Sequence, residues 1–178
     1  MKQVVDIRTI SYEEWLQYRR SGIGGSDAGA IAGVNPYSSI ASVYFDKVGE
    51  INSSPDMQEA SEAIYWGKRL EDIIADEFAK RTGLQIEKSH YILRSEENPF
   101  MLANLDRIIT GKEEGLECKT TSSFKKCDWD EECIPEMYMA QVQHYMAVTG
   151  FEGWWVAVLI GGNHFRYQYI ERDDEYID

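Results

Sequence analysis

A short charged strand near the middle of the chain restricts the possible structures more than any other feature. Residues 115–120 have the pattern of a β-strand, in which successive side chains point to opposite faces. Glu117 and Lys119 therefore share one face, and Cys118 takes the other. A carboxylate and an ammonium group held side by side can position a divalent cation next to a nucleophilic water.

The segment before this strand supplies a second carboxylate. Residues 100–109 are predicted to form a strand that carries Asp106, and residues 110–115 are predicted to form the connecting turn. Such a hairpin places Asp106 beside Glu117. The alternative is an ordinary charged hairpin that faces solvent, because a Glu-x-Lys pattern alone is common.

Composition limits the class of protein. The 178 residues are enough for one domain, predicted to span 1–178, and no apolar run is long enough to cross a membrane. Three cysteines without a secretory signal favour a reduced cytoplasm, and neither the cysteines nor the histidines have metal-ligand spacing. The net charge of −13 opposes binding of nucleic acid through the overall field of the protein. It still allows a nuclease whose basic groups gather in one groove.

The N-terminal region offers a candidate phosphate site. Ser11 and Glu14 form a capping-box pattern before a helix that ends at Arg19 and Arg20. A glycine-rich loop follows, and Ser26 or Asp27 can cap a second predicted helix over residues 28–32. Backbone donors at a helix start beside two arginines can bind phosphate; the alternative is a plain helix–helix turn.

Two further helices carry polar groups on otherwise apolar or aromatic faces. In the predicted helix Met57–Thr82, Glu71 lies on the apolar stripe, where a carboxylate must be paired, protonated or bound to a metal. A buried Glu–Arg pair is the alternative. In a predicted helix over residues 136–148, Tyr138 and Gln141 share a face with Tyr145, either at an active site or as a polar rim.

The remaining segments complete the expected architecture. Strands are predicted over residues 84–93, 151–160 and 164–171, and a surface loop over residues 52–56. Lysines 125 and 126 lie in a polar loop that is either solvated or near a nucleic-acid backbone.

The order of these features resembles a known family. The pattern Asp106, Glu117-x-Lys119 is that of the PD-(D/E)xK nuclease superfamily. The Tyr138-Met-Ala-Gln-Val-Gln segment and the Ile-Glu-Arg-Asp stretch near the end are similar to the YqaJ-type viral recombinases, the family of the bacteriophage lambda exonuclease. The likeness runs from about residue 15 to residue 174.

The resemblance implies an α/β fold with a mixed central β-sheet flanked by helices, and a nuclease dependent on one or two Mg²⁺ ions, with Mn²⁺ as a substitute. It implies 5′→3′ digestion of one strand of linear double-stranded DNA for recombination by single-strand annealing. The residues to which the resemblance assigns catalysis are Asp106, Glu117, Lys119, Glu71, Gln141 and Tyr138. The metal-associated residues would be Asp106, Glu117, Cys118 through its carbonyl, and Glu71. Arg19 or Arg20, with Ser26, would bind the 5′-phosphate.

The same resemblance implies partners and a location. The partners are DNA ends and a single-strand annealing protein, and no membrane is involved. The protein is expected to form a homo-oligomer, which is a trimer in some relatives. The expected location is the cytoplasm of a bacterial host of a phage or prophage. Because relatives continue into C-terminal helices, the chain is expected to lack them. The alternative functions are a structure-specific endonuclease or repair nuclease of the same superfamily, and a catalytically silent DNA-binding or phage module.

Overall fold

Two β-sheets and the helices around them make up the computed structural model, which describes residues 1–49, 57–129 and 133–178. The loop expected over residues 52–56 lies outside the described residues. The larger sheet has the order β2 (Ile86–Lys88), β5 (Arg107–Ile109), β6 (Glu114–Thr121), β7 (Gly153–Ile160) and β8 (His164–Glu171). Strands β6 and β7 run parallel, and the other neighbours run antiparallel, so the sheet is mixed. The smaller sheet has the order β1 (Lys2–Asp6), β3 (Tyr91–Arg94) and β4 (Leu102–Asn104).

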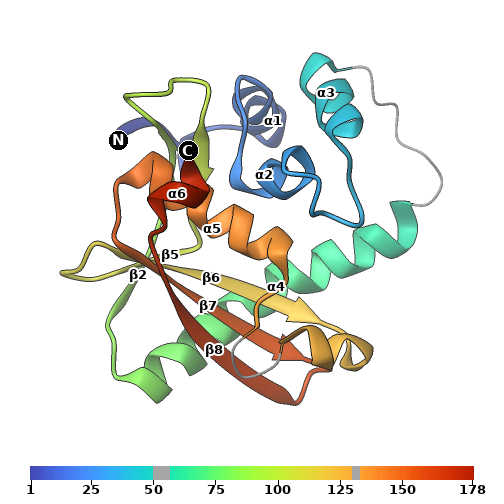
Figure 1. The fold of residues 1–178 in the computed structure, drawn as a ribbon, viewed down its shortest axis with the longest axis vertical. Helices are drawn as coiled ribbons and strands as arrows, with labels where there is room; N and C mark the ends of the chain where they lie inside the picture. The colour runs from blue at the N-terminus through green and yellow to red at the C-terminus, as the bar shows by residue number, and fades with distance from the viewer. Residues whose placement is uncertain (50–56, 130–132) are drawn as a thin grey trace.

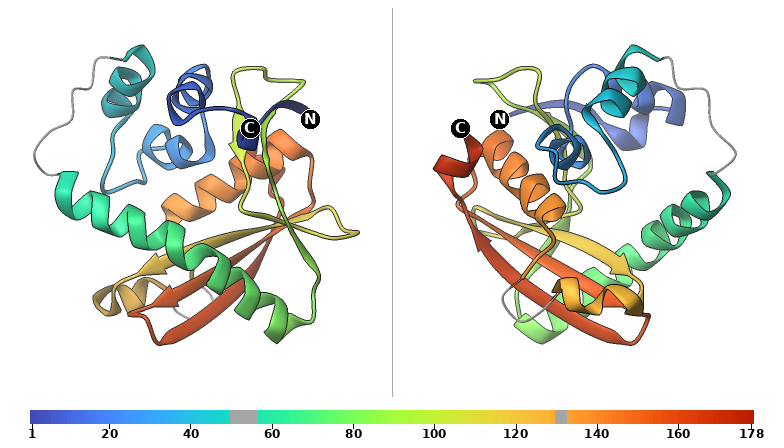
Figure 2. Two further views of the ribbon diagram at one scale, coloured as in Figure 1. Left: turned by 180° about the vertical axis from the view of Figure 1, so that it is seen from behind. Right: turned by 45° about the vertical axis from the view of Figure 1, so that its right-hand side comes forward.

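Helices cover both faces of the larger sheet (Figure 1). Helix α4 (Met57–Thr82) crosses one face and α5 (Glu136–Thr149) the other, with the N-terminal helices gathered beyond α5 (Figure 2). The remaining helical segments are η1 (Ile7–Thr9), α1 (Tyr12–Arg20), α2 (Gly25–Ile31), α3 (Ile40–Val48), η2 (Ser123–Trp129) and α6 (Asp174–Ile177). Among the described residues, no helix is both long and apolar enough to cross a membrane.

Strand β7 is apolar on both sides because both of its faces are buried. Trp154, Val156 and Val158 pack into the core under α5, whereas Trp155 and Ala157 pack into the core under α4. A continuous apolar run is typical of such a central strand. The adjacent strand β6 has the same two faces, so Glu117 and Lys119 point toward α5. Leu116 lies in the core on the α4 side.

Two predicted strands are wrong in one respect, because each is broken in the middle. Residues 84–93 form β2 and β3, and residues 100–109 form β4 and β5. The two halves belong to different sheets, so a single antiparallel ribbon bends from one sheet into the other. Asp106 lies at the bend, between β4 and β5. Its side chain therefore does not have to follow the alternating directions of side chains within a paired strand.

The helix ends follow local sequence rules. The predicted capping box at Ser11 is confirmed, with Glu14 bonded back to the Ser11 amide at 2.8 Å. Gly83 and Gly150 end α4 and α5 in the left-handed conformation that favours glycine. Helix α2 begins three residues earlier than predicted, at Gly25, because Asp27 bonds back to the Gly24 amide rather than capping the helix itself.

Candidate active site

Glu117, Lys119 and Gln141 form a closed triangle of hydrogen bonds between β6 and α5. Lys119 Nζ lies 2.6 Å from Glu117 Oε1 and 2.9 Å from Gln141 Oε1, and Gln141 Nε2 donates to the same Glu117 oxygen at 2.7 Å. All three side chains are largely withdrawn from solvent, with Glu117 only 4% exposed. The triangle fixes the orientation of both functional groups on the strand.

Two tyrosines of α5 complete this cluster. The ring of Tyr138 lies 4.8 Å from Lys119 Nζ, a cation–π distance. Tyr145 accepts a 2.8 Å hydrogen bond from Gln141 through its hydroxyl. The predicted face of Tyr138, Gln141 and Tyr145 therefore does point at the Glu-x-Lys strand.

Lys119 carries a positive charge in this site. Burial alone would favour the neutral amine, but the carboxylates of Glu117 and Asp106 outweigh it and raise the pKa of Lys119 above its ordinary value. Lys119 can therefore donate hydrogen bonds and stabilise negative charge.

Asp106 occupies the bend beside the same strand. Its Oδ2 accepts a 2.8 Å hydrogen bond from the Cys118 amide, one residue before β5 begins to pair with β6. Burial, followed by the nearby charges of Glu117 and Glu71, raises the pKa of Asp106 well above its ordinary value. A second negative charge beside Glu117 is therefore unfavourable in the protein alone.

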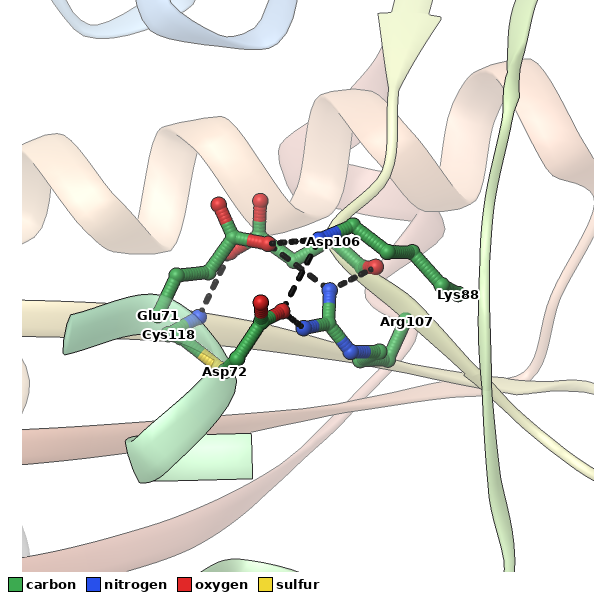
Figure 3. A network of polar contacts seen from close by, with 6 residues as sticks. All are labelled: Glu71, Asp72, Lys88, Asp106, Arg107 and Cys118. Atoms are coloured by element: carbon green, nitrogen blue, oxygen red, sulfur yellow. Dashed lines mark hydrogen bonds and ion pairs between the residues drawn. The ribbon is translucent and has the colours of Figure 1, made fainter. Parts of the chain in front are cut away.

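Glu71 reaches this region from α4, but it is paired with a cation (Figure 3). Its Oε1 accepts from Arg107 Nη1 at 2.7 Å, and Lys88 Nζ lies 3.8 Å away. Arg107 also bonds to Asp72, the next residue on the helix. The structure thus contains the Glu–Arg pair that the sequence left as an alternative, with Arg107 buried and Glu71 partly exposed at 24%. The metal role of Glu71 stays a prediction.

The donor set is consistent with a cation between Asp106 and Glu117. Among the described residues, no three acidic, histidine or cysteine side chains form a metal cluster by themselves. However, Glu117 Oε2 is buried without a hydrogen-bond partner, which is costly for a carboxylate oxygen. Burial raises the pKa of the Cys118 thiol, so Cys118 would contribute its carbonyl and not a thiolate. Oxygen donors of this kind suit Mg²⁺.

The structure separates the two candidate arginines. Arg19 Nη2 donates to Ser26 Oγ at 3.1 Å, and its charge acts on the buried Tyr145 hydroxyl. Arg20 turns toward Asp46, 3.9 Å away. Arg19 and Ser26 are therefore together near the Glu117 cluster, and Arg20 is not with them.

A buried ion pair holds the Arg19 region in place. Lys47 Nζ of α3 lies 2.6 Å from Asp27 Oδ2 and donates to the Arg19 carbonyl at 3.1 Å. The glycine-rich loop serves close packing here, since a Cβ on Gly25 would lie 2.4 Å from the Tyr145 ring. The backbone at Gly25, the first residue of α2, therefore lies close against α5.

Sequence reasoning missed Arg107 and Lys47 as parts of this region. Arg107 directly follows Asp106 in the sequence. Glu71 lies on the apolar stripe of its helix, and an acid in that position requires a cationic partner such as an arginine. That requirement could have identified Arg107. No local pattern pointed to Lys47, whose partners lie on two other helices.

The mixed sheet with Asp106 at its bend and Glu117-x-Lys119 on the adjacent strand is a PD-(D/E)xK nuclease fold, as predicted. Solved structures with a similar fold include an alkaline exonuclease from Laribacter hongkongensis, 17% identical with a TM-score of 0.73 over 93% of this chain and 84% of that chain. A phage related exonuclease from Haemophilus somnus 129PT is 14% identical, with a TM-score of 0.64 over 92% of this chain and 90% of that one.

The chain belongs to the YqaJ-like viral recombinase domain family, whose model matches residues 14–152. This confirms the resemblance found in the sequence. A curated relative, the uncharacterized protein YqaJ of Bacillus subtilis (strain 168), is 48% identical over 171 residues. The match covers 95% of this chain and 53% of the relative, so the chain spans about half the length of that protein.

Proposed function

We propose that this protein is a Mg²⁺-dependent deoxyribonuclease that digests one strand of linear double-stranded DNA in the 5′→3′ direction. The observation that carries the proposal is the partnerless, buried Glu117 Oε2 beside Asp106 and the Lys119–Gln141 pair. Membership of the YqaJ-like viral recombinase domain family supports it. The similar structures from Laribacter hongkongensis and Haemophilus somnus are both named as exonucleases. A further structure of the Laribacter enzyme is a complex with dAMP.

The proposed reaction divides between a metal and the protein. Asp106, Glu117 and the Cys118 carbonyl would hold Mg²⁺, which supplies Lewis-acid stabilisation of the phosphodiester. Lys119, charged and fixed by Gln141, would orient the attacking water and stabilise the charge that develops on the phosphate. Tyr138 would keep the ammonium group over the site.

End recognition would come from Arg19 and Ser26. A guanidinium and a hydroxyl 3.1 Å apart can bind a terminal phosphate without reading any base. The formal charge of −13 makes such a local contact necessary, because the protein as a whole repels DNA. Further parts of this proposal are an annealing protein as partner and a homo-oligomer, with a trimer suggested by the family.

A direct test uses a 5′-phosphorylated linear duplex, the same DNA blocked at its 3′ ends, and a closed circle, each with and without Mg²⁺. We expect Mg²⁺-dependent loss of one strand of both linear substrates and no cutting of the circle. Lys119→Ala should abolish the reaction, whereas Lys112→Ala, in the exposed hairpin turn, should not.

The other outcomes select other functions. Cutting of the circle would favour a structure-specific endonuclease or a repair nuclease. DNA binding without cleavage at any metal concentration would favour a catalytically silent module, and either result would contradict the proposal.

A further inference from the structure

A hollow of about 200 Å³ opens next to the Glu117 cluster, between η2, the N-terminal end of α5 and the connection from α2 to α3. Three aromatic side chains line it, namely Tyr37, Trp129 and Tyr138. Tyr37 is 66% exposed, and its amide donates to Asn35 Oδ1 at 2.8 Å, which fixes the turn that carries it. Trp129 is buried and lies 5.3 Å from the Tyr138 ring, so the inner wall is firm.

The hollow is continuous with the candidate active site. Tyr138 belongs to both, with Lys119 Nζ 4.8 Å from its ring and the hollow beside it. Thr121, which also lines the hollow, is two residues after Lys119 on β6 and therefore on the same face. Two strand residues span roughly 7 Å, so a nucleotide held at Lys119 would have the hollow within reach.

The charges at the hollow favour a base over a phosphate. Lys125 Nζ lies 4.2 Å from the centre of the Tyr37 ring, a cation–π contact, and is the cation among the described residues that line the hollow. Asp128 also lines it, and its negative charge would oppose a phosphate. Glu136 is a lining residue as well, but its carboxylate accepts a 3.2 Å hydrogen bond from the Tyr176 hydroxyl. Carboxylates do accept hydrogen bonds from the amino groups of bases, and aromatic rings provide stacking surfaces for unpaired bases.

We propose that this hollow is a nucleobase subsite, which receives an unpaired base of the strand being cut against the ring of Tyr37, with Tyr138 as part of the inner wall. The subsite rests on the proposed nuclease function and deepens it. It commits the substrate to at least one nucleotide unpaired from its complement near the cleaved phosphate. It also assigns Tyr37, an exposed residue of the α2–α3 connection, to substrate binding.

The first test pairs a protein change with a DNA change. Tyr37→Ala should raise KM about tenfold with little change in kcat, as expected for the loss of one base-stacking contact. A linear duplex with an abasic position among its first three 5′ nucleotides should be cut less well by the unmodified protein, and Tyr37→Ala should not add to that loss. Tyr44→Ala is the matched control, because Tyr44 is similarly exposed at 62% but does not line the hollow.

The second test measures binding and needs no cleavage. The Lys119→Ala protein is mixed with single-stranded oligonucleotides that carry 2-aminopurine at successive 5′ positions, and we expect fluorescence quenching at one position that Tyr37→Ala removes. Equal effects of Tyr37→Ala and Tyr44→Ala, in either test, would overturn the subsite. A protein without Mg²⁺-dependent cleavage but with Tyr37-dependent quenching would instead refute the nuclease proposal and retain base binding in the hollow.

Discussion

Arg107 Nη1 lies 2.7 Å from Glu71 Oε1 and so joins strand β5 to helix α4 beside Asp106. Arg107 is 5% exposed, and although burial opposes its charged form, the bond to Glu71 keeps its pKa above the ordinary value. A cation here offsets part of the charge of the surrounding carboxylates. Arg107 thus bonds to the Glu71 carboxylate, which the family resemblance assigns to a metal.

Replacing Arg107 tests this balance. Arg107→Gln should lower the free energy of unfolding without metal by about 1–3 kcal/mol, because the partly buried Glu71 loses a charge-assisted hydrogen bond. Added Mg²⁺ should recover a larger share of stability in this variant than in the unmodified protein. Denaturant unfolding with and without Mg²⁺ measures both effects. Arg69→Gln, on the exposed side of α4, is the control and should change stability by about 0.5 kcal/mol or less.

Asp106→Asn should stabilise the metal-free protein at neutral pH. The pKa of Asp106 is raised, so its contribution is fully present below the ordinary carboxyl pKa and is lost as pH rises through the raised value. The amide removes that loss and can still accept from the Cys118 amide. Thermal melts measure the difference in Tm between the variant and the parent. This difference should favour the variant at pH 7 and should be smaller at acid pH. Mg²⁺ should not raise the Tm of the variant further. A Mg²⁺-dependent rise in the variant would contradict the metal assignment.

Gln141→Leu should lower kcat about 10²-fold, since Lys119 loses the acceptor that orients it. KM should change little. Gln143→Leu is a matched control on the same helix, because Gln143 is also buried and bonded, but to the Glu171 carbonyl and the Asp173 amide. Steady-state digestion of linear duplex distinguishes them. Equal losses of kcat in the two variants would indicate a general structural effect.

Arg19→Ala should reduce the preference for 5′-phosphorylated over 5′-hydroxyl ends about tenfold, the value of one charge-assisted contact. Arg20→Ala should leave that preference unchanged, because Arg20 turns toward Asp46. The ratio of kcat/KM on the two substrates is the measurement. A loss of preference in the Arg20 variant alone would reverse the assignment.

Gly25→Ala should destabilise the fold by about 1–3 kcal/mol, because the added methyl would overlap the Tyr145 ring. Gly24→Ala is the neighbouring control, since its methyl would meet its nearest atom, Asp27 Oδ2, at 3.6 Å. Chemical denaturation of the two variants should differ by at least 1 kcal/mol. Similar stabilities would mean that α2 can move away from α5 at little cost.

Local patterns were sufficient to place most elements and the strand that carries Glu117 and Lys119. Strand alternation put Glu117 and Lys119 on one face, and helical spacing put Tyr138, Gln141 and Tyr145 on another, because these periods depend only on backbone geometry. Ser11, Gly83 and Gly150 marked helix ends for the same reason. Family resemblance then supplied the roles expected of the site residues.

Tertiary structure decided what the acids and arginines contact. The bend that divides residues 84–93 and 100–109 between two sheets arises from competition between strand partners far apart in sequence, which no local window contains. That bend frees Asp106 to bond Cys118 and directs Arg107 to Glu71 on α4. Likewise, only the packing of α1 to α3 on α5 selects Arg19 over Arg20. Pairing of buried charges depends on distances between elements, and those are fixed only when the sheets and helices have assembled.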